Sequence, residues 1–116
     1  MKYLCLVYSV PGAFGQLTAE EQAALDRDSL AYDDELKRQG AFLASSALQS
    51  PSTATTLRVR GGKVLSGDGP FAETKEVLCG FIFIEAPDKA AALRIAEGIP
   101  MARIGSIEVR PELEIG

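Results

Sequence analysis

The sequence predicts an α+β domain of the ferredoxin-like, split βαβ kind with an inserted β-hairpin. Three observations lead to this fold class. Segments typical of strands and helices follow in the order strand, helix, strand, hairpin, strand, helix, strand, which is the split βαβ order. The chain has 116 residues, enough for one hydrophobic core, so we expect residues 1–116 to form a single domain. Two of the expected strands are apolar on both faces, although two helices can cover only one face of a sheet.

The first half of the pattern is a strand, a loop and a long helix. Residues 2–8 predict a central strand because both of their alternating sets of side chains are apolar. Thr18 and Glu21 form a capping box at the start of the helix, and Gly40 marks its end. Helical spacing places one apolar face on Leu25, Ser29, Tyr32 and Leu36, and it assigns Asp26, Asp33 and Asp34 mostly to solvated faces.

The second half contains a hairpin and a second strand–helix–strand unit. Residues 55–60 alternate, so we expect Leu57 and Val59 to point inward, and Gly61-Gly62 predicts a two-residue hairpin turn. Asp88 caps the second helix. The expected elements are strands at 41–48, 55–60, 63–66, 80–86 and 106–110, a helix at 89–97, and a loop with room for one helical turn at 67–76.

Composition excludes several classes of protein. The net charge of -4 argues against nucleic-acid binding, which needs clustered Lys and Arg. The chain has no His, and Cys5 and Cys79 lie far apart in the sequence without metal-ligand spacing, so we expect no metal and no cofactor. We also expect the two cysteines to be reduced thiols rather than a disulfide. The N-terminal apolar run is too short for a signal peptide, and no run is long enough to span a membrane. We therefore expect a cytoplasmic protein without a membrane partner.

The doubly apolar strands predict a homodimer. Two helices leave one face of the sheet uncovered, and about five large apolar side chains in water would forgo roughly 10 kcal/mol, at ~1.5–3 kcal/mol each. A second copy of the chain, packed face to face, would cover them through an isologous interface.

Two motifs carry a family resemblance. Residues 68–76 read Asp-Gly-Pro-Phe-Ala-Glu-Thr-Lys-Glu, and residues 107–111 read Ile-Glu-Val-Arg-Pro. With the opening strand and the strand at residues 53–60, they resemble the YCII-related proteins of the DGPF subgroup over nearly the whole chain. The resemblance implies a ferredoxin-like, dimeric α+β barrel. The members of this family are largely uncharacterised, and those of the DGPF subgroup are often associated with alternative sigma factors in bacteria.

The resemblance also marks a departure. The wider family carries a His–Asp pair, and some members are thought to be enzymes on that ground. The family's His lies on the first helix, eleven residues before the closing Gly, and that position is Ser29 in this chain. The acid–base pair of the wider family is therefore absent.

Asp68 is the candidate catalytic residue. A carboxylate at the mouth of a cleft, with its pKa raised by burial, would serve as a general base. The alternative is that the Asp68 side chain only bonds backbone N–H groups in an Asp-Gly-Pro turn.

The candidate binding residues are Ser29, Tyr32, Phe71, Glu73, Lys75 and Arg103. Glu73 and Glu76 would share a face if their segment were helical, and Lys75 would hold an anionic group; the alternative is a solvated surface. Tyr32 is favoured as a core residue, with its hydroxyl bonded at the edge of a pocket. Arg103 is expected either to hold an anionic group of a ligand or to form an ion pair with a carboxylate of the chain. Arg110 is expected to pair with Glu108, or with a carboxylate of residues 73–76 and so pin the loop to the sheet.

Two functional hypotheses remain open at this point. The first is a module that binds a small organic molecule or a protein partner and is linked to sigma-factor regulation. The second is a cofactor-free enzyme that acts on a small molecule by acid–base chemistry at Asp68. The absence of a nucleophile–base pair favours the first, whereas a cleft between helix and sheet with a polar floor would favour the second.

Overall fold

The computed structural model describes all 116 residues and shows a mixed α+β chain with two α-helices and antiparallel sheets. Every expected element is present within a few residues of its predicted bounds. The elements are β1 (Lys2–Ser9), η1 (Phe14–Gln16), α1 (Ala19–Arg38), β2 (Phe42–Ala47), η2 (Pro51–Thr53), β3 (Thr55–Arg60), β4 (Lys63–Asp68), β5 (Val77–Glu85), α2 (Lys89–Glu97), η3 (Pro100–Arg103) and β6 (Ser106–Pro111).

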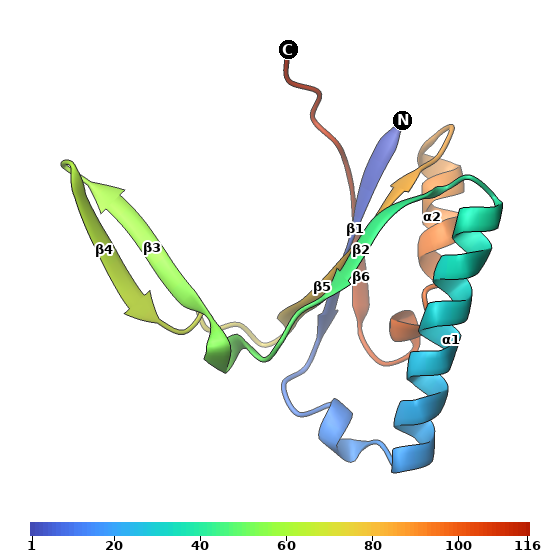
Figure 1. Cartoon of the computed structure of the whole chain (residues 1–116), viewed down its shortest axis with the longest axis horizontal. Helices are drawn as coiled ribbons and strands as arrows, with labels where there is room; N and C mark the ends of the chain where they lie inside the picture. The colour runs from blue at the N-terminus through green and yellow to red at the C-terminus, as the bar shows by residue number, and fades with distance from the viewer.

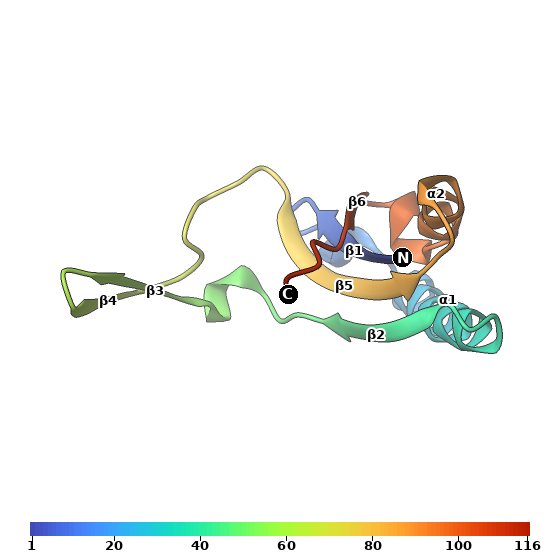
Figure 2. The same cartoon turned by 90° about the horizontal axis from the view of Figure 1, so that it is seen from above.

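Four strands form the main sheet in the order β2-β5-β1-β6, and all neighbouring pairs are antiparallel. Both helices lie on one side of this sheet (Figures 1 and 2). β1 and β5, the two strands predicted to be apolar on both faces, occupy the two central positions. This arrangement gives the sheet one covered face and one face without a helix. No helix in the structure is both long and apolar enough to cross a lipid bilayer.

The helix ends follow their sequence signals. The Thr18 side chain accepts a hydrogen bond from the Glu21 backbone N–H, and Glu21 accepts one from the Thr18 N–H, which completes the predicted capping box. Gly40, just beyond the helix, has a φ of 73°, a left-handed conformation that favours glycine. The Asp88 carboxylate accepts from the Ala91 N–H at the start of α2.

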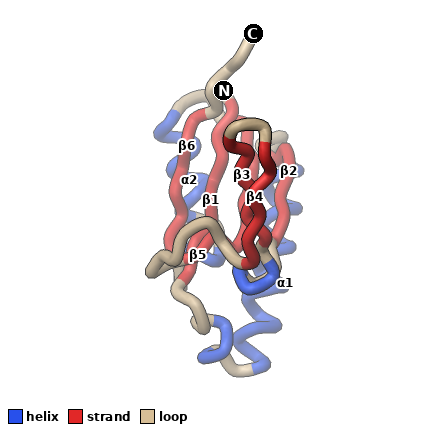
Figure 3. Tube along the Cα trace, turned by 90° about the vertical axis from the view of Figure 1, so that its left-hand side faces the viewer, coloured by secondary structure: helices blue, strands red, loops and turns tan.

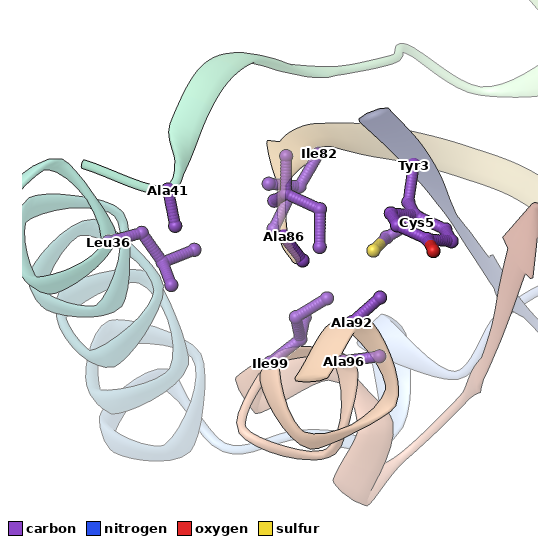
Figure 4. Close-up of a cluster of buried hydrophobic side chains, with 10 residues drawn as sticks. Tyr3, Cys5, Leu36, Ala41, Ile82, Ala86, Ala92, Ala96 and Ile99 are labelled. Carbon is purple, nitrogen blue, oxygen red and sulfur yellow. The ribbon is translucent and has the colours of Figure 1, made fainter. Parts of the chain in front are cut away.

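The hydrophobic core lies between the sheet and the helices (Figure 4). Tyr3, Cys5 and Val7 of β1 point into it, and Ile82 and Ile84 of β5 lie beside them. α1, α2 and the segments that flank them supply the rest of the buried cluster, namely Leu36, Ala41, Ala86, Ala92, Ala96 and Ile99. The predicted alternation along β1 is confirmed because these side chains are buried, whereas their neighbours on the other face are partly exposed.

The face of the sheet away from the helices carries an apolar centre. Leu6 pairs with Phe81 and Leu4 with Phe83 across β1 and β5, and all four side chains are partly exposed. We call this surface, centred on Leu4, Leu6, Phe81 and Phe83, the open face. Its apolar character is the observation on which the predicted dimer depends.

The inserted hairpin forms as predicted but does not pack inward. Gly61 and Gly62 both have positive φ, 57° and 76°, as a two-residue hairpin turn requires. Leu57 and Val59 were expected to point into the core, yet they are 64% and 60% exposed, so that prediction is wrong for the single chain. The physical reason is visible in Figures 1 and 3: β3 and β4 project away from the main sheet on the side opposite the helices. We call residues 55–68 the arm.

Candidate functional site

A cleft lies between α1 and the main sheet. Its volume is about 230 Å³, and it is lined by residues of α1, the ends of β2 and β5, and the η3 segment. We call it the α1 cleft. The apolar part of its wall includes Val7, Leu25, Ile82, Ile99 and Met101. This wall is continuous with the core, so the cleft is formed by elements that the core holds in place.

The polar part of the α1 cleft comes from two elements. α1 contributes Asp26, Ser29 and Asp33, and β2 contributes Ser45 and Ser46. Ser45 Oγ donates a hydrogen bond to Asp33 Oδ2 over 3.1 Å, which ties the strand to the helix across the cleft. Asp26 Oδ1 accepts from Gln22 Nε2 at 3.1 Å, one turn earlier on the same helix. The carboxylates are therefore oriented by neighbours.

Ser29 and Tyr32, two of the predicted binding residues, both line the α1 cleft. The Tyr32 hydroxyl donates to the backbone oxygen of Ile95 at 2.6 Å, so its polar end holds α1 to α2 and its ring forms part of the wall. Burial raises the pKa of Tyr32, and the nearby Cys5 and Glu35 add to the rise. Tyr32 stays protonated and acts as a packing and anchoring residue.

The remaining predicted site residues lie elsewhere. Asp68 ends β4 on the arm and is exposed, and no hydrogen bond of the turn involves its carboxylate. Backbone groups hold the base of the arm instead: the Gly69 N–H donates to Ala54 O at 2.7 Å, and Thr56 Oγ1 donates to Gly69 O at 2.9 Å. The turn role proposed for the Asp68 side chain is therefore not seen. Its role as a general base stays a prediction, and the structure does not bring it to the α1 cleft.

The loop after Asp68 contains bends but no helical turn. Glu73 and Glu76 therefore do not share a helix face, and Glu73 and Lys75 are exposed. Phe71 is 77% exposed and lies over a second hollow at the base of the arm, which Glu76 also lines. Glu76 is the residue that joins this loop to the sheet, because its Oε1 accepts from Ser106 Oγ at 3.0 Å.

The two arginines form ion pairs. Arg103 donates to Asp28 Oδ2 of α1 at 3.2 Å, an ion pair that links η3 to the helix. Its role in holding an anionic ligand stays a prediction. Arg110 pairs with Glu108 of its own strand at 2.5 Å. Glu108 is one of the two partners expected for Arg110, so that alternative is confirmed. The alternative contact to the loop carboxylates is not formed, because the strand places both Arg110 and Glu108 beside Leu4 and Leu6 on the open face.

Sequence reasoning missed three lining residues. Asp26 and Asp33 were assigned mostly to solvated faces. Asp26 is exposed and Asp33 is half-buried, but both lie about one turn from Ser29 and line the cleft. The signal that could have found them is the spacing of Asp26, Ser29 and Asp33, three and four residues apart, which places them on one side of a helix. Cys79 was expected to be buried like Cys5, but it is only partly buried and its side chain reaches the cleft.

The structure brings together no group of three or more His, Cys, Asp or Glu side chains suited to a metal ion. It also leaves both cysteines unpaired. The chemistry available at the α1 cleft is therefore that of carboxylates, hydroxyls and one thiol against an apolar wall.

Comparison with known proteins decides the family. The model of the YCII-related domain matches residues 1–115. The chain belongs to the YCII-related domain family. An uncharacterised protein of Rhizobium meliloti (strain 1021) is 34% identical to this YCII-related domain over 113 residues, which cover 96% of this chain and 91% of the relative. The family match therefore extends over the α1 cleft, the open face and the arm alike.

The two cysteines of this YCII-related domain should differ sharply in reactivity. Cys5 is fully buried, and desolvation raises its pKa to about 11, so about a thousandth of it is thiolate at pH 8. Cys79 lines the α1 cleft and contacts Ser9 Oγ at 3.0 Å. We expect a thiol reagent at pH 8 to label Cys79 first and Cys5 only after unfolding, as measured by mass spectrometry of digested protein. Cys79→Ser should remove the fast phase; equal rates for both thiols would contradict the assignment.

Proposed function

We propose that this YCII-related domain is a small-molecule-binding module whose ligand occupies the α1 cleft. The observation that supports it is the meeting of an apolar wall with oriented polar side chains from two elements, which is typical of ligand sites. The cleft of about 230 Å³ is smaller than the ~300–1,000 Å³ of most ligand sites. The ligand is accordingly a small organic molecule.

The charge of the lining selects the ligand. Asp26 and Asp33 are the only charged residues that line the α1 cleft, and no Lys or Arg accompanies them. An anionic ligand would meet two carboxylates of like charge, whereas an amine would gain charge-assisted hydrogen bonds. We therefore favour a compact molecule with an apolar body and a protonated amine or hydroxyl groups.

Benzylamine is a suitable probe because it joins a small apolar ring to a protonated amine. In ¹⁵N-resolved NMR spectra of the full chain, we expect benzylamine at millimolar concentration to shift the amides of Ser29, Asp33 and Gly80. Asp33→Asn should weaken this binding by about tenfold, the effect of ~1.4 kcal/mol from one charge-assisted hydrogen bond.

Asp34 supplies the matched control. It follows Asp33 on α1, is exposed and does not line the cleft. Its Oδ1 lies 3.8 Å from Lys37 Nζ. Asp34→Asn removes the same charge but should leave benzylamine binding unchanged. Benzoate, which reverses the charge of the probe, should bind more weakly than benzylamine. Equal binding of the two probes, or shifts confined to residues outside the cleft, would refute the proposal.

We also propose the finer fold and assembly that the sequence suggested. The order β2-β5-β1-β6, with α1 between β1 and β2 and α2 between β5 and β6, supports a ferredoxin-like arrangement of one domain. The apolar open face supports a homodimer in which two sheets pack face to face. The dimer does not depend on the ligand, because the α1 cleft and the open face lie on opposite sides of the sheet.

The Asp-Gly-Pro-Phe motif at residues 68–71 supports membership of the DGPF subgroup. Through that resemblance we propose a cytoplasmic module that acts beside an alternative sigma factor, without direct contact to nucleic acid. Co-expression with such a sigma factor, followed by size-exclusion chromatography, tests this role. Co-elution of the two proteins would support this role; separate elution would contradict it.

A further inference from the structure

The arm has two chemically different faces. The register pairs Val59 with Val64 and Leu57 with Ser66, so these side chains share one face, which we call the apolar face of the arm. The same register pairs Arg60 with Lys63 and Arg58 with Leu65 on the other face, which is basic. A hairpin with this pattern is built to cover something with one face and to meet water with the other.

Nothing in its own chain covers the apolar face of the arm. Leu57, Val59 and Val64 are 64%, 60% and 67% exposed, and every residue from 57 to 68 is exposed. An isolated two-stranded hairpin is marginally stable in water, and three aliphatic side chains on one face are more than a solvated hairpin needs. The arm is thus a folded element without its packing partner.

The position of the arm indicates where its partner lies. The arm stands on the side of the main sheet away from the helices (Figures 1 and 2), which is also the side of the open face. A second copy that packs on the open face therefore comes to lie beside the arm. The arm and the open face therefore offer two separate apolar surfaces on the same side of the main sheet.

Charge favours a second copy of this chain as the partner. The arm contains Arg58, Arg60, Lys63 and Asp68, a net charge of +2, so the rest of the chain carries -6 within the total of -4. Opposite charges attract the arm to the body of another copy. A nucleic acid would instead meet the strongly acidic remainder of the chain.

We propose that each arm packs its apolar face against the body of the partner copy, so that two chains embrace each other reciprocally. This inference rests on the proposed homodimer and goes beyond it, because it assigns the arm, in addition to the sheet, to the interface. The basic side chains of the opposite face stay in water and attract the acidic body of the partner from there.

The sharpest test changes one face of the arm at a time. The double variant Val59→Thr/Val64→Thr keeps the branched shape and the strand propensity but removes apolar surface from the apolar face. Leu65→Thr makes a similar change on the basic face, where Leu65 is 52% exposed. We expect the double variant to raise the dimer dissociation constant at least tenfold in sedimentation equilibrium and Leu65→Thr to leave it within twofold.

Removal of the arm gives a second test. Ala54 and Gly69 are hydrogen-bonded neighbours, so deletion of residues 55–68 joins two ends that already meet. The shortened chain should keep its helical circular dichroism and dimerise more weakly than the full chain. If it fails to fold, the Val59→Thr/Val64→Thr pair still decides the question.

Cross-linking identifies what the arm contacts. A photoreactive residue, Val64→p-benzoylphenylalanine, in a mixture of tagged and untagged full chains should produce a tagged–untagged product. Linkage only within one chain would mean that the arm folds onto its own sheet and would overturn the inference. A dimer insensitive to all arm variants would overturn it too but would leave the sheet-to-sheet dimer standing; a monomeric wild-type chain would refute both.

Discussion

Leu6→Glu should yield a folded monomer under conditions in which the wild-type chain is a dimer. Leu6 lies at the centre of the open face, opposite Phe81, and its side chain does not enter the core between the sheet and the helices. A face-to-face dimer would bury the new carboxylate without a partner, and an uncompensated buried charge costs about 3–5 kcal/mol. That penalty corresponds to a rise of roughly 150-fold or more in the dissociation constant.

The measurement is sedimentation velocity at micromolar concentration. The wild-type chain should sediment with twice the chain mass of 12.3 kDa, and Leu6→Glu with the single mass. Leu30→Glu is the matched control, because Leu30 is 68% exposed on α1 and lies on neither the open face nor the α1 cleft. It should remain a dimer. A wild-type monomer, or equal dissociation of both variants, would contradict the assignment of the open face as the interface.

The sequence predicted the fold where local chemistry decides the structure. The capping box at Thr18, the turn at Gly61-Gly62 and the Asp88 cap each depend on residues close together in the chain, and each appears as expected. The alternation in β1 was equally informative, because a strand with a period of two presents fixed sides to the sheet. These features needed no knowledge of distant contacts.

The same local logic failed where tertiary placement decides. Alternation assigned Leu57 and Val59 to an inner face, but a hairpin has an inner face only if another element covers it. Asp68 was expected at a cleft mouth because its motif is dense in polar residues. It lines a hollow on the arm together with Arg58 and Phe71, but it does not reach the α1 cleft. Ser29 and Tyr32 do line the α1 cleft, because their face of α1 points toward the sheet.

Gly80→Ala should destabilise the protein and deform the α1 cleft. Gly80 is buried in β5 and lines the cleft, and it has no positive φ, so its backbone conformation does not require glycine. Close approach requires it instead. A Cβ at this position would lie 2.5 Å from Ser46 O and 3.2 Å from the Ala47 Cα, both of them backbone atoms of β2. A backbone neighbour cannot rotate away as a side chain can.

The strand β2 must therefore shift away from β5 to admit the methyl group. Overpacking of this kind typically lowers the free energy of unfolding by about 1–3 kcal/mol, which corresponds to several degrees in melting temperature for a domain of this size. The shift also moves Ser45, which holds Asp33 across the cleft, so benzylamine binding should fall with stability. Thermal unfolding followed by circular dichroism, with and without benzylamine, measures both effects.

Gly67→Ala separates this packing effect from the general effect of replacing a glycine. Gly67 lies on β4 of the arm, has no positive φ, and a Cβ there would meet no atom within 4 Å. The substitution restricts the unfolded chain without crowding the folded one, so Gly67→Ala should be neutral or stabilise by up to about 1 kcal/mol. Because the two variants make the same chemical change, a loss of stability at Gly80 alone would show that close contact between β2 and β5 fixes the wall of the α1 cleft; equal melting temperatures would show that β2 yields freely.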